Sequence, residues 1–179
     1  GIRNSFGLAV DPQTGFLWDT ENGPDVYDEI NLVEKKFNSG WAKIQGPSNG
    51  KTLPQITEYE EYIYSEPEFS WEIPVGVTAI EFPNSNDFKK YQDFLFVADT
   101  NNGIIYKFKL DDTRTKFVFE SPYLQDNVLN MLEDSSGNEP MDEIVFAKNL
   151  GLISDMKFGP DGALYVISLM EGKIYKISS

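Results

Sequence analysis

The sequence predicts an all-β fold, and two features of the 179-residue chain support this prediction. Short apolar and aromatic runs alternate with turn residues, whereas helical periodicity is poor along the whole chain. Three stretches also look like copies of one unit, which consists of a strand, a turn containing Pro or Gly, and an aromatic-rich strand. Repetition of such a unit is typical of a β-propeller, in which each unit forms one blade.

The clearest strand candidates lie in the second half of the chain, and the last two form a hairpin. They are, in chain order, 94–98 (FLFVA), 104–110 (IIYKFKL), 116–120 (KFVFE), 163–168 (ALYVIS) and 173–177 (KIYKI). Turn signals separate them, such as Asn-Asn-Gly at 101–103. We expect one short helix, at 123–133.

The repeated units are marked by a proline that follows the first strand. Pro12, Pro83 and Pro160 occupy this place and are separated by 71 and 77 residues. This period exceeds the roughly 40–45 residues of a minimal blade, so we expect long polar loops at 46–67 and 124–149. The alternative is a β-sandwich whose hairpins resemble one another by chance. The coincidence of turn, proline and aromatic positions favours the propeller.

The repeats predict a single, partial propeller domain of about three blades. The blade-like units are expected at about 1–70, 71–150 and 151–179, and the last of them contains only three strands. A closed ring needs roughly four to eight blades. The two open sides must then be covered, either by the remaining half of a longer polypeptide or by a second copy, because open blade faces expose apolar surface and strand edges.

The composition excludes several kinds of catalytic and metal sites. The chain has no His and no Cys, so it cannot contain a Ser-His-Asp or Cys-His nucleophile, an imidazole or thiolate zinc site, or a disulfide. It carries 29 Asp and Glu against 15 Lys and Arg, a net charge of −14. This charge argues against binding to nucleic acid or to an anionic membrane surface.

The segment 1–41 holds the side chains best suited to chemistry. Arg3 and Asn4 stand just before the first strand of a blade, where side chains can point into a central channel. Carboxylates, amides and glycines follow within 19–41, and their hard oxygen donors suit Ca²⁺. Their spacing does not match an EF-hand loop, and a solvated acidic loop is the alternative interpretation.

The same segment resembles a known family. The run G-x-R-N-x-x-G-L-A is followed in order by L-W-x-x-E-x-G-P, D-E-I-N-L and N-x-G-W, and the similarity continues to 159–166 (GPDGALYV). These motifs are similar to those of the glucose/sorbosone dehydrogenase family, and nearly the whole chain looks like the C-terminal half of a family member. The resemblance implies a six-bladed propeller and a soluble quinoprotein. Such an enzyme oxidises aldose sugars with pyrroloquinoline quinone (PQQ) and calcium, by hydride transfer from the sugar to the quinone.

The resemblance also implies roles for four residues. Arg3 and Asn4 match the family pair that contacts the quinone, and an arginine there could stabilise the charge that develops on it. Glu29 matches the calcium-binding glutamate of D-E-I-N, and Ser39 stands in the place of the tyrosine in N-Y-G-W. If Ser39 binds the metal through its backbone carbonyl, the change of side chain is tolerated.

Other positions depart from the family pattern. Asn101 lies where the family usually has a lysine that contacts the cofactor, and Leu152 and Ser154 align with sites that tend to hold arginines. PQQ carries three carboxylates, so the loss of these cations should weaken its binding. The histidine base of the family belongs to the half that has no counterpart here, so no catalytic residue is assigned.

Two functions therefore remain open. The chain is expected to be the C-terminal part of a PQQ- and calcium-dependent sugar dehydrogenase, located by resemblance in the periplasm or outside the cell. The alternative is a propeller of the same descent that has lost the quinone and serves as a non-catalytic binding or structural module.

Overall fold

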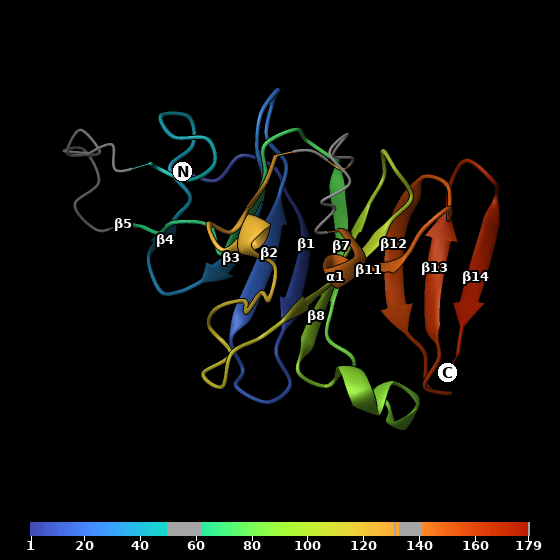
Figure 1. The fold of residues 1–179 in the computed structure, drawn as a ribbon. Coiled ribbons are helices and arrows are strands. Elements are labelled where there is room, and N and C mark those ends of the chain that lie inside the picture. Colours follow the sequence, from blue (N-terminus) through green and yellow to red (C-terminus); the bar gives the residue numbers. More distant parts are fainter. Residues whose placement is uncertain (50–61, 131, 133–140, 179) are drawn as a thin grey trace.

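The computed structural model describes residues 1–49, 62–130, 132 and 141–178, and these residues form a nearly all-β molecule. Three mainly antiparallel sheets stand side by side in chain order, as blades of a propeller do (Figure 1). The all-β propeller prediction is confirmed. No helix in the described ranges is both long and apolar enough to cross a membrane.

The first sheet has five strands in the order β1-β2-β3-β6-β10. They are β1 (Ser5–Val10), β2 (Leu17–Glu21), β3 (Asp28–Val33), β6 (Phe69–Trp71) and β10 (Val128–Leu129). The outermost strand, β10, runs parallel to β6 and comes from a distant part of the chain. A separate parallel pair, β4 (Phe37–Asn38) and β5 (Ile63–Tyr64), lies beside this sheet.

The second sheet has the order β11-β9-β8-β7 and the third has the order β12-β13-β14. Their strands are β7 (Val77–Glu81), β8 (Phe94–Asp99), β9 (Ile105–Lys109), β11 (Val145–Ala147), β12 (Ile153–Phe158), β13 (Leu164–Ser168) and β14 (Lys173–Ile177). The helical elements are short: η1 (Asn86–Tyr91), η2 (Pro122–Leu124) and α1 (Met141–Ile144). The unit boundaries at 70/71 and 150/151 stay a prediction.

The strands expected at 94–98, 104–110, 163–168 and 173–177 are present with nearly these bounds, but the strand expected at 116–120 is not. There, one isolated bridge joins Phe117 to Leu110. The aromatic side chains at 117 and 119 are buried in the core, so their alternation arises from packing and not from a strand ladder.

The helix expected at 123–133 is also wrong over its described residues. A single 3₁₀ turn, η2, is capped by Ser121, whose Oγ accepts the Tyr123 N–H. Asn127 then adopts a left-handed conformation, with φ of 59°. Its carbonyl accepts the Ser70 N–H at 2.9 Å, which draws the chain into β10. Residues 131 and 133 lie outside the described residues, as do parts of the loops expected at 46–67 and 124–149.

Aromatic side chains fill the spaces between neighbouring sheets. Between the first and second sheets, Phe69 packs against Phe108 with ring centroids 4.7 Å apart, and Trp71 lies beside both. Between the second and third sheets, Phe88 of η1 packs against Phe158 of β12 with ring centroids 5.0 Å apart. Buried aromatic pairs add about 0.5–1.5 kcal/mol each beyond their burial, so they fix how the blades stack.

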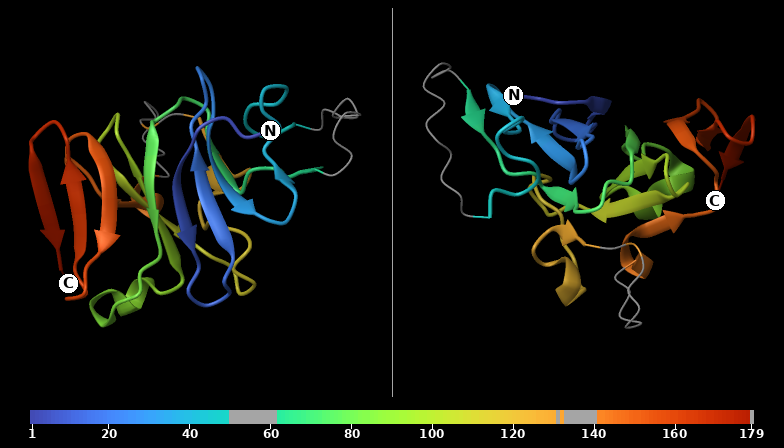
Figure 2. Two further views of the ribbon diagram at one scale, coloured as in Figure 1. Left: turned by 180° about the vertical axis from the view of Figure 1, so that it is seen from behind. Right: turned by 90° about the horizontal axis from the view of Figure 1, so that it is seen from above.

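The innermost strands of the three sheets are β1, β7 and β12. β7 contacts both of the others, and the three strands line a cavity of about 280 Å³. The views in Figure 2 show the three sheets following one another across the molecule in chain order. Glu81, Asp155 and Lys157 lie in the lining, and Glu81 forms an ion pair with Lys157. This inner groove is the part of the molecule that corresponds to a propeller channel.

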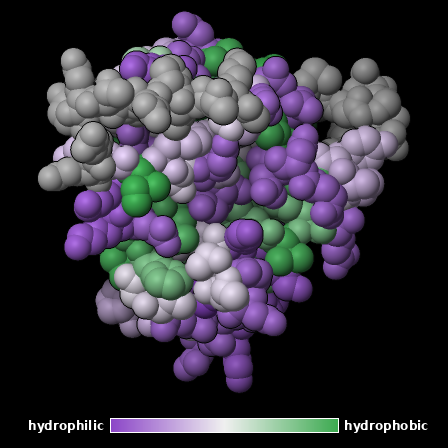
Figure 3. Space-filling model, turned by 90° about the vertical axis from the view of Figure 1, so that its left-hand side faces the viewer, coloured by the Kyte–Doolittle hydropathy of each residue, from purple (hydrophilic) through white to green (hydrophobic). Residues whose placement is uncertain are grey.

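Apolar side chains remain exposed on the first inner strand. Phe6, Leu8 and Val10 of β1 expose 59%, 61% and 61% of their surface. On the third sheet, Ile167 and Ile174 lie opposite each other and are also exposed. The face of the molecule near β4 and β5, by contrast, is mostly hydrophilic with scattered hydrophobic patches (Figure 3). Exposed apolar stripes of this kind are typical of surfaces that pack against further structure.

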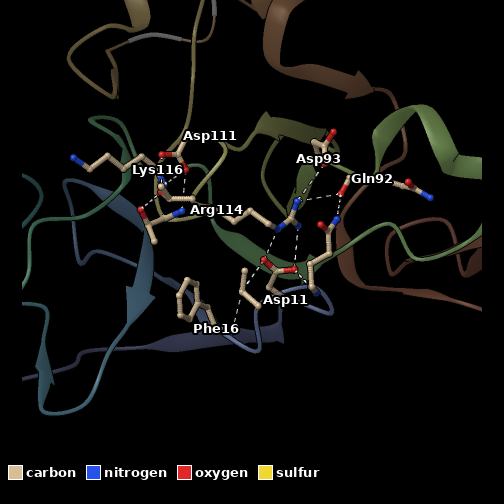
Figure 4. Close-up of polar contacts among 11 residues, drawn as sticks. Asp11, Phe16, Gln92, Asp93, Asp111, Arg114 and Lys116 are labelled. Carbon is tan, nitrogen blue, oxygen red and sulfur yellow. Dashed lines mark hydrogen bonds and ion pairs between the residues drawn. The ribbon is translucent and has the colours of Figure 1, made fainter.

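A buried ion pair joins the first sheet to the second. Arg114 donates from Nε and Nη2 to the two carboxylate oxygens of Asp11, at 2.6 and 3.0 Å (Figure 4). Its Nη1 also reaches the Gln92 carbonyl at 3.4 Å and Asp93 at 3.5 Å. Burial raises the pKa of Asp11, but the bonds from Arg114, the Gln13 N–H and the Thr14 hydroxyl outweigh it and lower that pKa below its usual value.

Replacing Arg114 should therefore destabilise the fold strongly. Arg114→Met leaves the fully buried Asp11 without its cation, and the free energy of unfolding should fall by about 3 kcal/mol or more, as measured by urea denaturation. The double variant D11N/R114M should recover part of this loss because no charge is left buried. The exposed Lys116→Met is the control and should change stability by less than about 0.5 kcal/mol.

Candidate functional site

Four polar side chains share one face of the ladder between β2 and β3. Asp19 lies directly opposite Asn31, and Glu21 directly opposite Glu29. Because side chains alternate along a strand, these four point to one face, while Trp18 and its neighbours fill the core on the other. All four are buried, exposing 5% of their surface or less. We call them the β2–β3 face.

Glu21 ties the first residues of the chain to this face. Its Oε1 accepts the backbone N–H of Arg3 at 2.7 Å and the hydroxyl of Ser39 at 3.1 Å. Burial raises the pKa of Glu21, and the two donors lower it only in part. Segments that are far apart in the sequence therefore meet at one carboxylate.

Glu29 is held by a glycine of the following loop. Its Oε1 accepts the Gly46 N–H at 2.7 Å, and its Oε2 accepts from Asn31 Nδ2 at 3.4 Å. Gly46 has a φ of 70°, and a side chain there would collide with the Tyr27 ring. Burial and the nearby negative charge of Glu21 raise the pKa of Glu29 to about 7. The raised pKa means that burial favours the protonated form of Glu29.

Arg3 and Asn4 both lie on the surface, and each forms a hydrogen bond with the backbone of Asn22. The Arg3 guanidinium donates to the Asn22 carbonyl and lies over the Trp41 ring, 5.4 Å from its centroid. The Asn4 carbonyl accepts the Asn22 N–H at 3.0 Å, and the Asn22 side chain donates to the Val77 carbonyl at 2.8 Å. The pair is thus fixed at the start of β1, the strand that lines the inner groove.

Ser39 and Glu29 both lie next to Glu21. Ser39 donates a hydrogen bond to Glu21, and Glu29 lies opposite Glu21 in the strand ladder. The Ser39 hydroxyl is buried and donates to Glu21 and to the Gly1 carbonyl, at 3.1 and 2.7 Å. Within the described ranges, no group of three or more Asp and Glu side chains is arranged to hold a metal ion. The predicted roles of Glu29 and Ser39 as metal ligands, and of Arg3 and Asn4 in quinone binding, remain predictions.

Sequence reasoning missed Asn22 and Asp28, although both lie inside the motifs quoted above. Asp28 accepts the N–H groups of Gly23, Val75 and Gly76 at 2.9, 2.8 and 2.7 Å. It thereby fixes the turn that contains Asn22. The signal was its place in D-E-I-N, where a buried aspartate beside a turn often collects backbone N–H groups.

Of the three positions that depart from the family pattern, Ser154 lies at the inner groove. Asn101 is exposed and its side chain donates to the Pro74 carbonyl at 3.3 Å. Ser154 lines the groove cavity, whereas Leu152 does not, and the Leu152 carbonyl accepts the Leu169 N–H at 2.8 Å. None of these three side chains carries a charge.

Glu68 adds a further carboxyl next to the β2–β3 face. Its Oε2 accepts the Leu32 N–H at 2.6 Å. Burial, together with the negative charges of Asp19 and Glu34, raises its pKa to about 7, and the bond from Leu32 opposes this rise. The folded protein therefore keeps a proton on Glu68 that the unfolded chain loses near pH 4.5.

Because the folded state holds this proton more tightly than the unfolded state, the free energy of unfolding should fall as the pH rises. Between about pH 4.5 and 7 the folded state binds more protons than the unfolded state, so wild-type stability should decline across this window. Glu68→Gln removes the titration while keeping an acceptor for Leu32. The variant should match the wild type near pH 4.5 and have a higher Tm at pH 8. Exposed Glu72→Gln is the control, and an equal Tm difference for E68Q at both pH values would contradict the assignment.

Comparison with known proteins agrees with this geometry. Residues 1–176 match the sequence model of the family described as "Glucose / Sorbosone dehydrogenase". The chain is 27% identical over 181 aligned residues to the aldose sugar dehydrogenase YliI of Escherichia coli, an alignment that covers 99% of this chain and 42% of that protein.

Two solved structures share the fold. A crystal structure of glucose dehydrogenase has a TM-score of 0.70 and 23% identity, with 100% of this chain matching 46% of that one. The PQQ-bound aldose sugar dehydrogenase of Streptomyces coelicolor has a TM-score of 0.60 and 18% identity, with coverage of 94% and 38%. The chain thus spans less than half the length of each of these proteins. The match along nearly its entire length shows that this chain belongs to the glucose/sorbosone dehydrogenase family.

Proposed function

We propose that the chain is the C-terminal part of a PQQ- and calcium-dependent sugar dehydrogenase that oxidises an aldose. The observation that carries this proposal is the junction at Glu21. There the quinone-contact motif containing Arg3 and the N-x-G-W motif containing Ser39 meet, next to Glu29 of D-E-I-N. These motifs are separate in the sequence, yet hydrogen bonds to Glu21 join the first two, and Glu29 lies opposite Glu21 in the strand ladder.

Calcium fits this cluster by its donor chemistry. Calcium prefers carboxylate and carbonyl oxygens with flexible coordination. Glu29 is buried, carries no cationic partner among the described residues, and faces Glu21. We propose that Glu29 binds calcium with the backbone carbonyl of Ser39. The ion would stabilise the ionised form of Glu29, which burial otherwise disfavours.

The quinone fits in part. Arg3 is exposed and most of its guanidinium donors are available, so it can bind one carboxylate of PQQ, and Asn4 stands beside it. A bound quinone would supply the two-electron acceptor that sugar oxidation requires. The residues of this chain would bind and orient it, while the proton-accepting base would belong to another part of the protein. A substrate sugar would lie in the same region, at the groove.

The alternative proposal is a quinone-free propeller that binds another ligand. The uncharged side chains at Asn101, Leu152 and Ser154 favour it, because they replace cations that a tricarboxylate would need. The groove itself favours neutral ligands, since Lys157 is paired with Glu81 and Asp155 adds a negative charge.

The exposed stripes on β1 and on the third sheet suggest that further blades cover them. We propose that these belong to the remaining half of the same polypeptide, in a six-bladed ring, in preference to a second copy. The family resemblance also supports a periplasmic or extracellular location.

Arg3→Ala separates the two functions. In the full-length protein with calcium, the wild type should bind PQQ with a spectral shift, and the variant should bind about 10- to 100-fold more weakly because one charge-assisted hydrogen bond is lost. Lys90→Ala removes an exposed cation on η1 and should leave PQQ affinity unchanged. If the wild type does not bind PQQ at all, the quinone-free alternative stands.

Residues 1–179 expressed alone should associate, because Phe6, Leu8 and Val10 remain uncovered. Light scattering should report dimers or larger species. Leu8→Asp should shift the distribution towards monomer, whereas Leu169→Asp, outside the β1 stripe, should do so less. A soluble monomer of the unsubstituted chain would show that the stripe needs no cover.

A further inference from the structure

Two oxidisable aromatic side chains lie in contact where the first sheet packs against the second. Trp71 ends β6 and Tyr106 lies in β9, and their ring centroids are 5.1 Å apart. Both side chains are enclosed in the core, exposing 1% and 0% of their surface. Indole and phenol rings lose an electron more readily than other aromatic side chains, and rings in contact exchange electrons rapidly. An electron removed from Trp71 can therefore be replaced by one from Tyr106.

A buried carboxylate accepts the hydroxyl hydrogen of Tyr106. The Tyr106 hydroxyl donates to Asp99 Oδ2 at 2.7 Å, and Asp99 is fully buried. The sheet register creates this contact, because Val97 lies directly opposite Tyr106 and Asp99 lies two residues further along β8 on the same face. A phenol that loses an electron becomes a strong acid. A base that is already in hydrogen-bond contact lets the proton leave together with the electron.

Asp99 is suited to accept this proton. Burial raises the pKa of Asp99 above its usual value, and the bonds from Tyr106 and Asn102 oppose the rise only in part. None of the ion pairs formed by the described residues involves Asp99. Its Oδ2 also accepts from the side chain of the exposed Asn102 at 3.1 Å, so two hydrogen bonds lead from the Tyr106 hydroxyl to the surface. The hydroxyl is thus enclosed but lies near the solvent.

A second tyrosine–aspartate pair, on the third sheet, lacks this combination. Tyr165 donates to Asp161 at 2.8 Å, but Asp161 is exposed and also pairs with Lys176 at 2.7 Å. The bonds from Lys176 and Tyr165 lower the pKa of Asp161 to about 2, so it is a poorer proton acceptor than Asp99. Among the described residues, only Tyr106 combines a fully buried hydroxyl–carboxylate contact with a tryptophan ring.

We propose that Trp71 and Tyr106 form a redox-active pair that takes up oxidising equivalents, with Asp99 as the proton acceptor. A diffusing one-electron oxidant, such as the carbonate radical anion, takes one electron from Trp71. Tyr106 replaces that electron, and its O–H bond breaks as the proton moves to Asp99 Oδ2. The products are carbonate, a neutral tyrosyl radical and a neutral Asp99 carboxyl group. A reductant of the ascorbate class restores the pair by giving back one electron, while the proton returns from Asp99. This activity does not depend on PQQ or calcium.

Flash photolysis of the full-length protein, without added quinone, tests the pair. Photogenerated tris(bipyridine)ruthenium(III) serves as the one-electron oxidant, and optical spectra distinguish tyrosyl from tryptophanyl radicals. The wild type should form a long-lived tyrosyl radical, and should form it more slowly in D₂O than in H₂O because a proton moves with the electron. Tyr106→Phe should lose most of this signal and leave the radical on tryptophan. Asp99→Asn keeps the phenol but removes its proton acceptor, so it should also leave the radical on Trp71.

Tyr165→Phe is the matched control, because it also removes a hydroxyl that donates to an aspartate. It should keep the tyrosyl yield and lifetime of the wild type. The isotope comparison uses only the wild-type protein, so it decides even where a buried variant fails to fold. The inference is overturned if the tyrosyl signal survives in Tyr106→Phe, if Tyr165→Phe loses as much of it, or if D₂O leaves the rate of its formation unchanged.

Discussion

The fold depends on buried aspartates that are neutralised by backbone N–H groups. Asp28, at the start of β3, accepts N–H groups from Gly23 and from the crossover at Val75, Gly76 and Val77. This crossover leads from the first sheet into β7, so one carboxylate joins the start of β3 to the entry into β7. In a chain with a net charge of −14, backbone dipoles supply positive ends that the few lysines and arginines cannot. Burial raises the pKa of Asp28, and the four N–H bonds oppose that rise.

The second sheet uses the same device. Asp99 ends β8 and accepts the N–H groups of Asn102 and Gly103 at 2.8 and 2.9 Å, together with the Tyr106 hydroxyl at 2.7 Å. The β2–β3 face is the exception, because its carboxyl groups are buried without a full set of donors. Folded proteins keep unpaired buried polar atoms mainly where a ligand pairs with them. On this face, the unpaired atoms lie within the family motifs.

Much of the fold could be predicted because the strands of the second and third sheets combine apolar runs with turn signals. The segment 116–120 has the same alternation but forms only an isolated bridge to Leu110, and its aromatic rings enter the core from outside the strand ladder. A two-residue strand such as β10 has no periodic signal at all. In the site, motif order pointed to Glu29 and Ser39. Asp19 and Asn31 could not be found in this way, because their meeting depends on the register of β2 and β3, which a sequence pattern does not fix.

The parallel pairing of β10 with β6 bears on the order in which the protein can fold during synthesis. The first sheet receives its last strand only after β7, β8 and β9 have been made, since β10 follows them in the chain. Its outer edge therefore stays unpaired on the nascent chain while the second blade emerges from the ribosome. The two blades form one cooperative unit with a long-range closure, a topology that folds slowly and exposes an edge to other chains until it closes. A cut between these blades, at the point where the repeat alone suggests a boundary, would separate the first sheet from its outer strand β10.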